Sequence, residues 1–292
     1  MVEPHYDISL APFTQYNIGG TAREVYVPSS ADELVEVFSR IRKSGLKYFL
    51  LGGGTNVLIG DGYWDGAVII TRDMTGHNTF DDHISCGAGL SSSKIAEIAL
   101  EHGKTGLEFL YLLPGTIGGA LAGNARYDMK NVSDVFLSAM AVHPEHGGRT
   151  FAAGDIAFDY KFTSVVEAGW VFCEVSLAWR DGDPSHIREA MDTIEKNRRE
   201  THHFDFPSCG CVFKNDYSRT IQAGRLIDSL GLKGLAVGGA QVAGFHANFI
   251  VNTGNATARD VLTLIEKIEA IVFERTGIRL EREVRLLGMF TS

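Results

Sequence analysis

Apolar residues along this chain follow two spacings, and the change from one to the other predicts a mixture of helices and strands. A spacing of three to four residues is clear in 31–45 (ADELVEVFSRIRKSG) and in 91–103, where a serine opens the segment and a glycine closes it. The segment 257–275 opens with the T-x-x-D capping pattern of Thr257 and Asp260. The same reasoning predicts two more helices, over 185–200 and 218–230.

Short apolar runs between turn residues predict the strands. KYFLLG, residues 47–52, predicts a buried strand, and 133–180 is rich in strand-forming residues with turns at HPEHGG and RDGDP. Further strands are expected in EVYVP (24–28), NVLIG (56–60), GAVIITR (66–72), the segment containing Cys-Gly-Cys, ANFIVN (247–252) and RLEREVRLLG (279–288).

The pattern changes character near residue 182, where we expect a domain boundary. The chain has 292 residues, which is long enough for two domains with separate cores. Residues 1–182 are expected to form an α+β domain with lobes of about 1–70 and 71–182. Residues 183–292 are expected to form a compact α/β unit.

The composition is typical of an ordinary globular protein, with 45% hydrophobic and 22% charged residues. No uninterrupted apolar run approaches the roughly 18 residues of a membrane span, and the first residues do not resemble a secretory signal. We therefore expect a cytoplasmic protein. A net charge of −9 argues against broad nucleic-acid binding, which requires a basic surface. The expected partners are small molecules, and the chain is expected to act as a monomer.

Glycine is the outlier of the composition, with 33 residues gathered in clusters. LGGGTNVLIGD (51–61) follows a predicted strand, and LLPGTIGGALAGNA (112–125) is similar in kind. Consecutive glycines allow backbone N–H groups to converge on an anion, but they also allow a tight turn to pack against a sheet. Neither cluster matches the Walker or the Rossmann pattern, so both interpretations stay open. Two such loops in one domain favour a dinucleotide with a pyrophosphate and a flat ring.

Two of the four cysteines, Cys209 and Cys211, flank a single glycine in PSCGCVFKND. They could form a metal corner, a strained disulfide, or one working thiol beside a bystander. The spacing matches no common zinc pattern, even with His202 and His203 nearby, so no metal site is predicted. A disulfide between residues i and i+2 is strained and is disfavoured in a reducing compartment. A single working thiol beside a bystander is the favoured interpretation, and a Cys/His site of unusual spacing stays open.

Eight segments occur in the order expected of one family: NIGGTA, LGGGTNVLIGD, GLEFLYLLPGTIGGALAGNA, FDYKFTS, RRETHHFDFPSCGCVFKND, AGRLIDSLGLKG, HANFIVN and LEREVRLLG. From about residue 10 to 288, the chain resembles the UDP-N-acetylenolpyruvoylglucosamine reductase (MurB) family. The resemblance implies a vanillyl-alcohol-oxidase-type domain that binds FAD non-covalently, followed by an α/β substrate domain. The short interval from Tyr160 to Pro207 is similar to the second type of the family, which lacks an extra substrate-covering insertion.

The resemblance also implies an activity. NADPH would reduce the FAD, and the reduced flavin would convert UDP-N-acetylglucosamine enolpyruvate into UDP-N-acetylmuramate for peptidoglycan synthesis. Hydride would reach the terminal methylene carbon, and a proton would have to be added to the neighbouring carbon. The implied FAD-binding residues are Gly52, Gly53, Gly54, Thr55, Asn56, Pro114, Gly115, Thr116, Gly118, Gly119 and Asn124.

Three catalytic residues follow from the resemblance. Cys211 stands where the family places a serine that donates the proton, and a thiol is more acidic than a hydroxyl. Glu283 and Lys161 match the family's charge-stabilising glutamate and arginine, but lysine lacks the bidentate fork of arginine. The implied substrate-binding residues are Arg199, Lys214, Asn215 and His246.

The departures from the family pattern keep two alternatives open. GNARYDMKN (123–131) and THHFDFP (201–207) replace the usual segments, and Lys161 replaces the arginine. The chain could be another FAD-dependent oxidoreductase of the same fold, or a non-catalytic protein that binds flavin or nucleotide sugar. FDYKFTS, GCVFKND and LEREV favour the reductase.

Overall fold

The computed structural model describes residues 2–290 and divides into two compact units. The first unit comprises Met1–His5, Glu24–Gly53 and Gly66–Glu200, and the second comprises Tyr6–Arg23, Gly54–Asp65 and Thr201–Ser292. This division differs from the single boundary predicted near residue 182. The helix at Pro184–Glu200 groups with the first unit, and two N-terminal segments group with the second. Apolar spacing reports which face of a segment is buried, but not which distant segment covers it.

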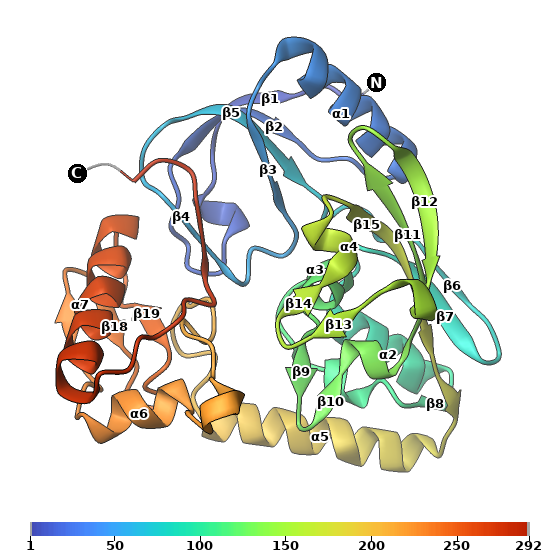
Figure 1. Cartoon of the computed structure of the whole chain (residues 1–292). Coiled ribbons are helices and arrows are strands. Elements are labelled where there is room, and N and C mark those ends of the chain that lie inside the picture. Colours follow the sequence, from blue (N-terminus) through green and yellow to red (C-terminus); the bar gives the residue numbers. More distant parts are fainter. Residues whose placement is uncertain (1, 291–292) are drawn as a thin grey trace. The chain divides into compact units, whose positions relative to one another are not determined.

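An antiparallel sheet of five strands forms the centre of the first unit (Figure 1), in the order β12-β11-β15-β7-β6. Helices α2, α3 and α5 contribute Ile95, Leu121 and Met191 to the core built on this sheet. The bounds are β6 (His77–Thr79), β7 (His83–Gly87), β11 (Phe136–His143), β12 (Gly147–Ala152), β15 (Val171–Ala178), α2 (Ser92–Glu101), α3 (Ile117–Ala122) and α5 (Pro184–Glu200).

The N-terminal helix begins and ends as its sequence predicts. In α1 (Ala31–Ser44), Ser30 accepts a hydrogen bond from the Glu33 N–H, and Gly45 ends the helix at a φ of 67°. Strand β3 (Tyr48–Leu51) pairs in parallel with β5 (Trp64–Ile70). The strand predicted at 47–52 is confirmed as β3, but the expectation that it is buried holds only for Leu51, because β3 lies at a sheet edge and Tyr48 is 38% exposed.

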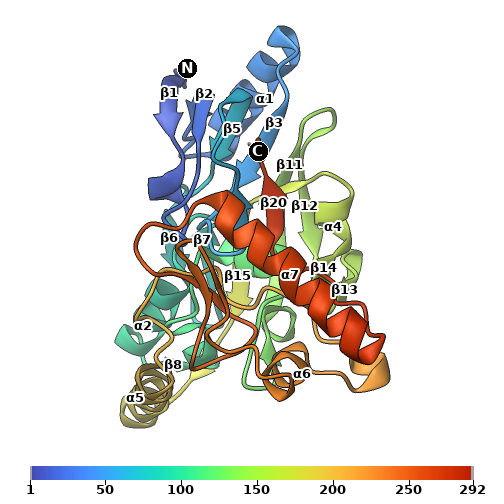
Figure 2. The same cartoon turned by 90° about the vertical axis from the view of Figure 1, so that its left-hand side faces the viewer.

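In the second unit, α7 (Ala258–Thr276) packs on the antiparallel strands β17 (Ala236–Val237), β18 (Ala240–Val242) and β19 (Ile250–Asn252). Figure 2 shows α7 along its length with α6 (Ala223–Ser229) beside it. The capping box of Thr257 and Asp260 is confirmed. Strand β20 (Arg285–Leu287) pairs in parallel with β4 (Val57–Ile59), which explains why an early segment belongs to this unit.

Two predicted elements of the second unit differ from the structure. The Cys-Gly-Cys segment is not a strand and makes only isolated bridges, Cys211 with Phe249 and Phe213 with Arg282. The predicted helix 218–230 is interrupted, because Thr220 adopts a left-handed φ of 56° between the 3-10 turn η5 (Tyr217–Arg219) and α6.

The remaining elements are short. They are β1 (His5–Ser9), β2 (Thr21–Tyr26), β8 (Lys104–Thr105), β9 (Arg126–Tyr127), β10 (Lys130–Asn131), β13 (Phe158–Asp159), β14 (Phe162–Thr163), β16 (Arg180–Asp181), α4 (Ser164–Glu167), η1 (Ala11–Phe13), η2 (Glu108–Leu110), η3 (Val132–Asp134) and η4 (Ala153–Asp155). Across residues 2–290, no helix combines the length and the apolar character that crossing a membrane requires.

Candidate active site

The two glycine clusters meet in the first unit. A Cβ atom on Gly53 would lie 2.6 Å from the Cα of Gly115, and one on Gly52 would lie 3.1 Å from the Thr116 hydroxyl oxygen. Such short separations are possible only because Gly52 and Gly53 carry no side chain. The clusters are therefore in direct backbone contact, as the interpretation of a tightly packed turn requires.

The second glycine cluster is hydrogen-bonded to the rest of the first unit at some residues and exposed to solvent at others. Gly118 donates its N–H to the Ala88 carbonyl at 2.8 Å, and a Cβ on Gly118 would come within 2.6 Å of the Ala88 Cβ. Thr116 caps α3 by accepting a hydrogen bond from the Gly119 N–H. Pro114 and Gly119, by contrast, are exposed. Packing explains Gly118, whereas Pro114 and Gly119 are accessible to a ligand.

The first cluster continues into the second unit at Gly54. Gly54 has a φ of 67°, and a Cβ there would lie 2.0 Å from the Phe13 carbonyl oxygen. Asn56 follows the partly buried Thr55 and donates its amide N–H to the Glu283 carbonyl at 3.2 Å. The Oδ1 atom of Asn56 is buried and has no hydrogen-bond partner among the described residues. A buried acceptor without a donor destabilises a fold, so this oxygen fits a ligand that supplies an N–H or O–H group.

The two cysteines of the Cys-Gly-Cys segment face different surroundings, because Gly210 turns the chain between them at a φ of 73°. Cys209 is 4% exposed in the main core of the second unit, with its thiol 3.0 Å from the Val57 carbonyl. Burial raises the pKa of the Cys209 thiol to about 12. Cys211 is only partly buried and packs against the small cluster of Ala243, Phe249 and Val251. The interpretation of Cys209 as a packing residue is confirmed, and neither thiol forms a disulfide.

Glu283 lies on the segment that runs beside Cys211. Its backbone N–H donates to the Val212 carbonyl at 2.7 Å, and Lys214 donates its N–H to Glu281 at 2.8 Å. On the other side of this segment, the Asn56 side chain binds the Glu283 carbonyl. The second unit thus gathers the segments of Asn56, Cys211 and Glu283, which are far apart in the sequence.

Lys161 belongs to the first unit, in the tight turn between β13 and β14. It has a left-handed φ of 57°, and its ammonium nitrogen lies 5.9 Å from the centre of the Tyr160 ring. Asn124 supports this hairpin, donating its amide to the Asp159 carbonyl at 3.4 Å and accepting from the Ser133 N–H at 3.1 Å. The Asn124 side chain is thus engaged in holding the turn that carries Lys161.

The four predicted substrate-binding residues divide between the units. Arg199, at the end of α5 in the first unit, pairs with Glu195 at 2.6 Å. In the second unit, Lys214 pairs with Glu281 at 2.6 Å, and Asn215 accepts a hydrogen bond from the Ala223 N–H at 3.0 Å. An anionic ligand at either cation would have to compete with its carboxylate partner.

His246 is partly buried in the second unit beside Gly224, whose Cβ would lie 3.0 Å from the imidazole Cε1. Burial, aided by the nearby positive charge of Lys233, lowers the pKa of His246 below its ordinary value. At neutral pH the ring is therefore neutral, which suits hydrogen bonding rather than charge pairing with a ligand.

Sequence reasoning missed Asn248, which is 3% exposed and holds the Cys211 segment in place. Its side chain accepts a hydrogen bond from the Phe213 N–H at 2.9 Å and donates to the Phe213 carbonyl at 2.8 Å. In the sequence, Asn248 is marked only by its position in HANFIVN, where the apolar residues define the expected strand and Asn248 does not.

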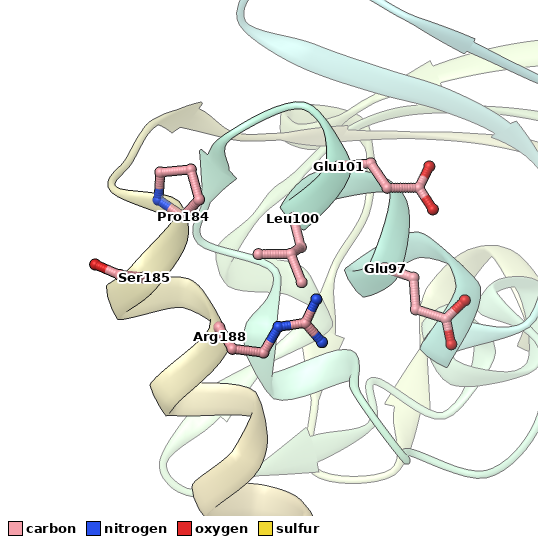
Figure 3. A pocket seen from close by; sticks show the side chains of 6 residues that line it. All are labelled: Glu97, Leu100, Glu101, Pro184, Ser185 and Arg188. Carbon is pink, nitrogen blue, oxygen red and sulfur yellow. The ribbon is translucent and has the colours of Figure 1, made fainter.

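A separate hollow of about 560 Å³ lies between α2 and α5 in the first unit (Figure 3). Its lining residues are Glu97, Leu100, Glu101, Pro184, Ser185 and Arg188, and none of them is a predicted site residue. Its two carboxylates, those of Glu97 and Glu101, both pair with Lys94, at 3.3 and 3.6 Å.

Comparisons with known proteins agree on a family. Residues 202–287 match the model of the UDP-N-acetylenolpyruvoylglucosamine reductase C-terminal domain, and residues 22–147 match that of an FAD binding domain. The UDP-N-acetylenolpyruvoylglucosamine reductase of Caldanaerobacter subterraneus is 34% identical, over 94% of this chain and 90% of the relative. That of Anaeromyxobacter dehalogenans is 38% identical, over 97% of this chain and 85% of the relative.

A solved structure supports the same assignment. The crystal structure of UDP-N-acetylenolpyruvylglucosamine reductase (MurB) from Thermus caldophilus has a TM-score of 0.81 to this chain, at 29% identity and covering 98% of both chains. The predicted architecture of an FAD-binding domain followed by a C-terminal domain is therefore confirmed. The chain belongs to the UDP-N-acetylenolpyruvoylglucosamine reductase (MurB) family of flavoenzymes.

Proposed function

We propose that this protein reduces UDP-N-acetylglucosamine enolpyruvate to UDP-N-acetylmuramate, a peptidoglycan precursor, with FAD as cofactor and NADPH as reductant. The observation that carries the proposal is similarity over nearly the whole chain to reductases of this name, together with the gathering of the Asn56, Cys211 and Glu283 segments. Each of these segments corresponds to a motif of the family.

The residues that would hold FAD belong to the two glycine clusters. The accessible Pro114 and Gly119 leave room for the cofactor to lie against the second cluster, and the partnerless Oδ1 of Asn56 suits a donor group of the cofactor. Gly53, Gly54 and Gly118 would act indirectly, by letting the loops pack closely. When bound, FAD supplies the hydride that an alkene cannot take directly from a protein side chain.

Cys211 is proposed to supply the proton. Its thiol would donate a proton to the substrate carbon that bears the ether oxygen, leaving a thiolate that solvent reprotonates before the next turnover. The partial burial of Cys211 against the cluster of Ala243, Phe249 and Val251 would limit competing access by water. Glu283 is proposed to act on the same substrate region, because its segment is hydrogen-bonded to the residue after Cys211.

Lys161 is proposed to stabilise the negative charge that develops on the substrate carboxylate during reduction. The turn that carries it is anchored by Asn124 and by the Thr163 hydroxyl, which donates to the Leu121 carbonyl at 2.9 Å. A fixed turn favours this role, because the backbone that carries the lysine does not have to be ordered anew in each turnover.

Arg199, Lys214, Asn215 and His246 are proposed to bind the UDP-sugar. The two cations would exchange their carboxylate partners, Glu195 and Glu281, for phosphate oxygens. We further propose that the protein works as a monomer in the cytoplasm, since its reductant and substrate are small soluble metabolites. Light scattering of the purified protein tests the oligomeric state.

A stopped-flow experiment tests the proposed reaction. Under anaerobic conditions, NADPH should bleach the flavin of the purified yellow protein, and addition of UDP-N-acetylglucosamine enolpyruvate should restore the colour. A protein that is recoloured by oxygen but not by this substrate would be another flavin oxidoreductase. A protein that is never bleached would be a binding protein, and either result overturns the proposal.

A further inference from the structure

Asn248 forms a three-part clamp on the segment that follows Cys211. Its side chain binds both polar groups of the Phe213 backbone, at 2.9 and 2.8 Å, and its own carbonyl accepts from the Val212 N–H at 2.8 Å. With 3% of its surface exposed, Asn248 is shielded from water, so these hydrogen bonds do not exchange readily with solvent.

The clamp bears on Cys211 because Val212 and Phe213, which Asn248 holds, directly follow Cys211 in the chain. Cys211 forms a β-bridge with Phe249, the neighbour of Asn248. It also packs against the cluster of Ala243, Phe249 and Val251. On its opposite side, backbone hydrogen bonds from Glu283 to Val212 and from Lys214 to Glu281 hold the segment, together with the exposed ion pair of the Lys214 and Glu281 side chains. The buried Asn248 side chain thus joins the segment that carries Cys211 to the segment that carries Phe249.

We propose that Asn248 is a positioning residue for the Cys211 thiol, setting how the thiol presents its proton to the substrate. The proposal rests on the proposed role of Cys211 as proton donor. Asn248 itself exchanges no proton and touches no substrate. Because proton transfer depends steeply on geometry, loss of the clamp should slow protonation of the substrate while leaving reduction of the flavin unchanged.

The chain offers a matched control in Asn252, on the same segment and 5% exposed. Its side chain donates to the Tyr16 carbonyl at 2.9 Å and accepts from the N–H groups of Gly254 and Ala256 at 2.9 and 3.0 Å. Removing it breaks a buried amide clamp of similar size that does not hold the Cys211 segment. Asn248→Ala and Asn252→Ala should therefore lower the melting temperature to a similar extent.

The first test uses thiol alkylation of the FAD-loaded protein, followed by mass spectrometry. Cys86, Cys173 and Cys209 are buried, so iodoacetamide should modify Cys211 first. We expect Asn248→Ala to change the alkylation rate of Cys211 several-fold and Asn252→Ala to leave it at the wild-type rate. Equal rates in all three proteins would overturn the proposal.

The second test separates the half-reactions by stopped flow. Asn248→Ala should be bleached by NADPH at the wild-type rate but recoloured by substrate about tenfold more slowly. Asn252→Ala should match wild type in both phases, and equal slowing in both variants would show a merely structural role. If the wild type itself is not recoloured by substrate, the proposed function fails, and the alkylation test still decides whether Asn248 positions the thiol.

Asn248→Asp keeps the test decisive if the alanine variant does not fold. Aspartate has the same shape and retains the acceptor for the Phe213 N–H, but it loses the donor to the Phe213 carbonyl. It should shift the alkylation rate and the recolouring rate in the same direction as alanine. Wild-type values of both rates in Asn248→Asp would contradict the proposal.

Discussion

Cys209 and Cys211 have the same side chain but different surroundings, and those surroundings determine what each thiol can do. Burial raises the pKa of Cys209 to about 12, so it remains a protonated packing residue at any physiological pH. Cys211 is partly exposed and lies on the segment hydrogen-bonded to Glu283. These surroundings support Cys211, rather than Cys209, as the proposed proton donor of the Cys-Gly-Cys segment.

Substitution of Cys211 tests this assignment at the scale of one residue. Cys211→Ala should lower turnover about 100-fold, because a proton donor is lost, while FAD remains bound. Cys211→Ser should retain much of the activity and, unlike wild type, should resist inactivation by hydrogen peroxide. Steady-state assays before and after peroxide treatment provide the measurement. Wild-type turnover in Cys211→Ala would exclude the thiol as the donor.

Lys161 gives a second prediction at this scale, since arginine binds a carboxylate through two parallel hydrogen bonds and lysine does not. Lys161→Arg should increase turnover several-fold, and Lys161→Ala should decrease it about 100-fold through the loss of charge stabilisation. Flavin reduction by NADPH serves as the control and should be unaffected in both. Unchanged turnover in Lys161→Ala would assign the ammonium group to the surface rather than to the reaction.

Elements of this protein depend on short-range contacts at their ends. The glycine loop after β3 can touch the loop before α3 only because Gly53 has no Cβ. Helix α7 begins at a capping box and is further held by Asp61, which accepts hydrogen bonds from the Ala258 and Arg259 N–H groups at 2.9 and 3.1 Å. Both contacts lead to predictions about stability.

Gly53→Ala should damage the FAD-binding loops. The new Cβ would lie 2.6 Å from the Gly115 backbone, and relief of this overlap should cost about 1–3 kcal/mol of unfolding free energy and weaken FAD binding. Gly76→Ala is the matched control, because a Cβ at Gly76 would meet no atom within 4 Å. Melting curves and flavin titrations measure the effect. Equal melting temperatures and equal FAD affinities of the two variants would show that the two loops can move apart without loss of stability or of FAD binding.

The capping box of α7 makes stability depend on pH. Hydrogen bonds from the Thr257 backbone N–H, and more weakly from that of Gly239, hold the pKa of Asp260 below its ordinary value. Because the folded pKa is depressed, the contribution is complete at neutral pH and is lost as pH falls through that pKa. The difference in melting temperature between wild type and Asp260→Asn should therefore shrink as pH falls below about 4. A difference in melting temperature that does not change with pH would contradict the proposed role of the Asp260 carboxylate.

The whole molecule is not a simple succession of domains. The core of the second unit takes Tyr16, Ile18 and Leu58 from early in the chain and combines them with residues after 201. Strand β4 also supplies the only partner that β20 has within the described residues. The C-terminal segment by itself therefore lacks part of its own core.

A fragment of residues 201–292 should not fold alone, because it would leave apolar surface uncovered where Tyr16, Ile18 and Leu58 pack. Circular dichroism should show no cooperative thermal transition for the fragment, whereas the full chain should show one. Mixing it with a peptide of residues 6–65 is a useful control, since restored structure would identify the missing segments. Cooperative unfolding of the fragment alone would contradict this division.

The sequence by itself determined the local elements and the family. Helices α1 and α7 could be predicted with their ends, because Ser30, Gly45 and the Thr257–Asp260 box act within a few residues of themselves. The ordered motifs led to the FAD-binding fold, which the comparisons confirmed. The proposed roles of Cys211, Lys161 and Glu283 also came from those motifs and stay predictions.

Only the tertiary structure decided which distant segments lie together. It showed Gly53 against Gly115, Glu283 beside Val212, and the buried Asn248 holding the chain next to Cys211. It also showed that Tyr48 is exposed at a sheet edge and that the expected Cys-Gly-Cys strand makes only isolated bridges. The physical reason is that residue spacing and capping act over a few positions, whereas hydrogen bonds and packing between segments that are distant in the sequence leave no periodic trace in either segment.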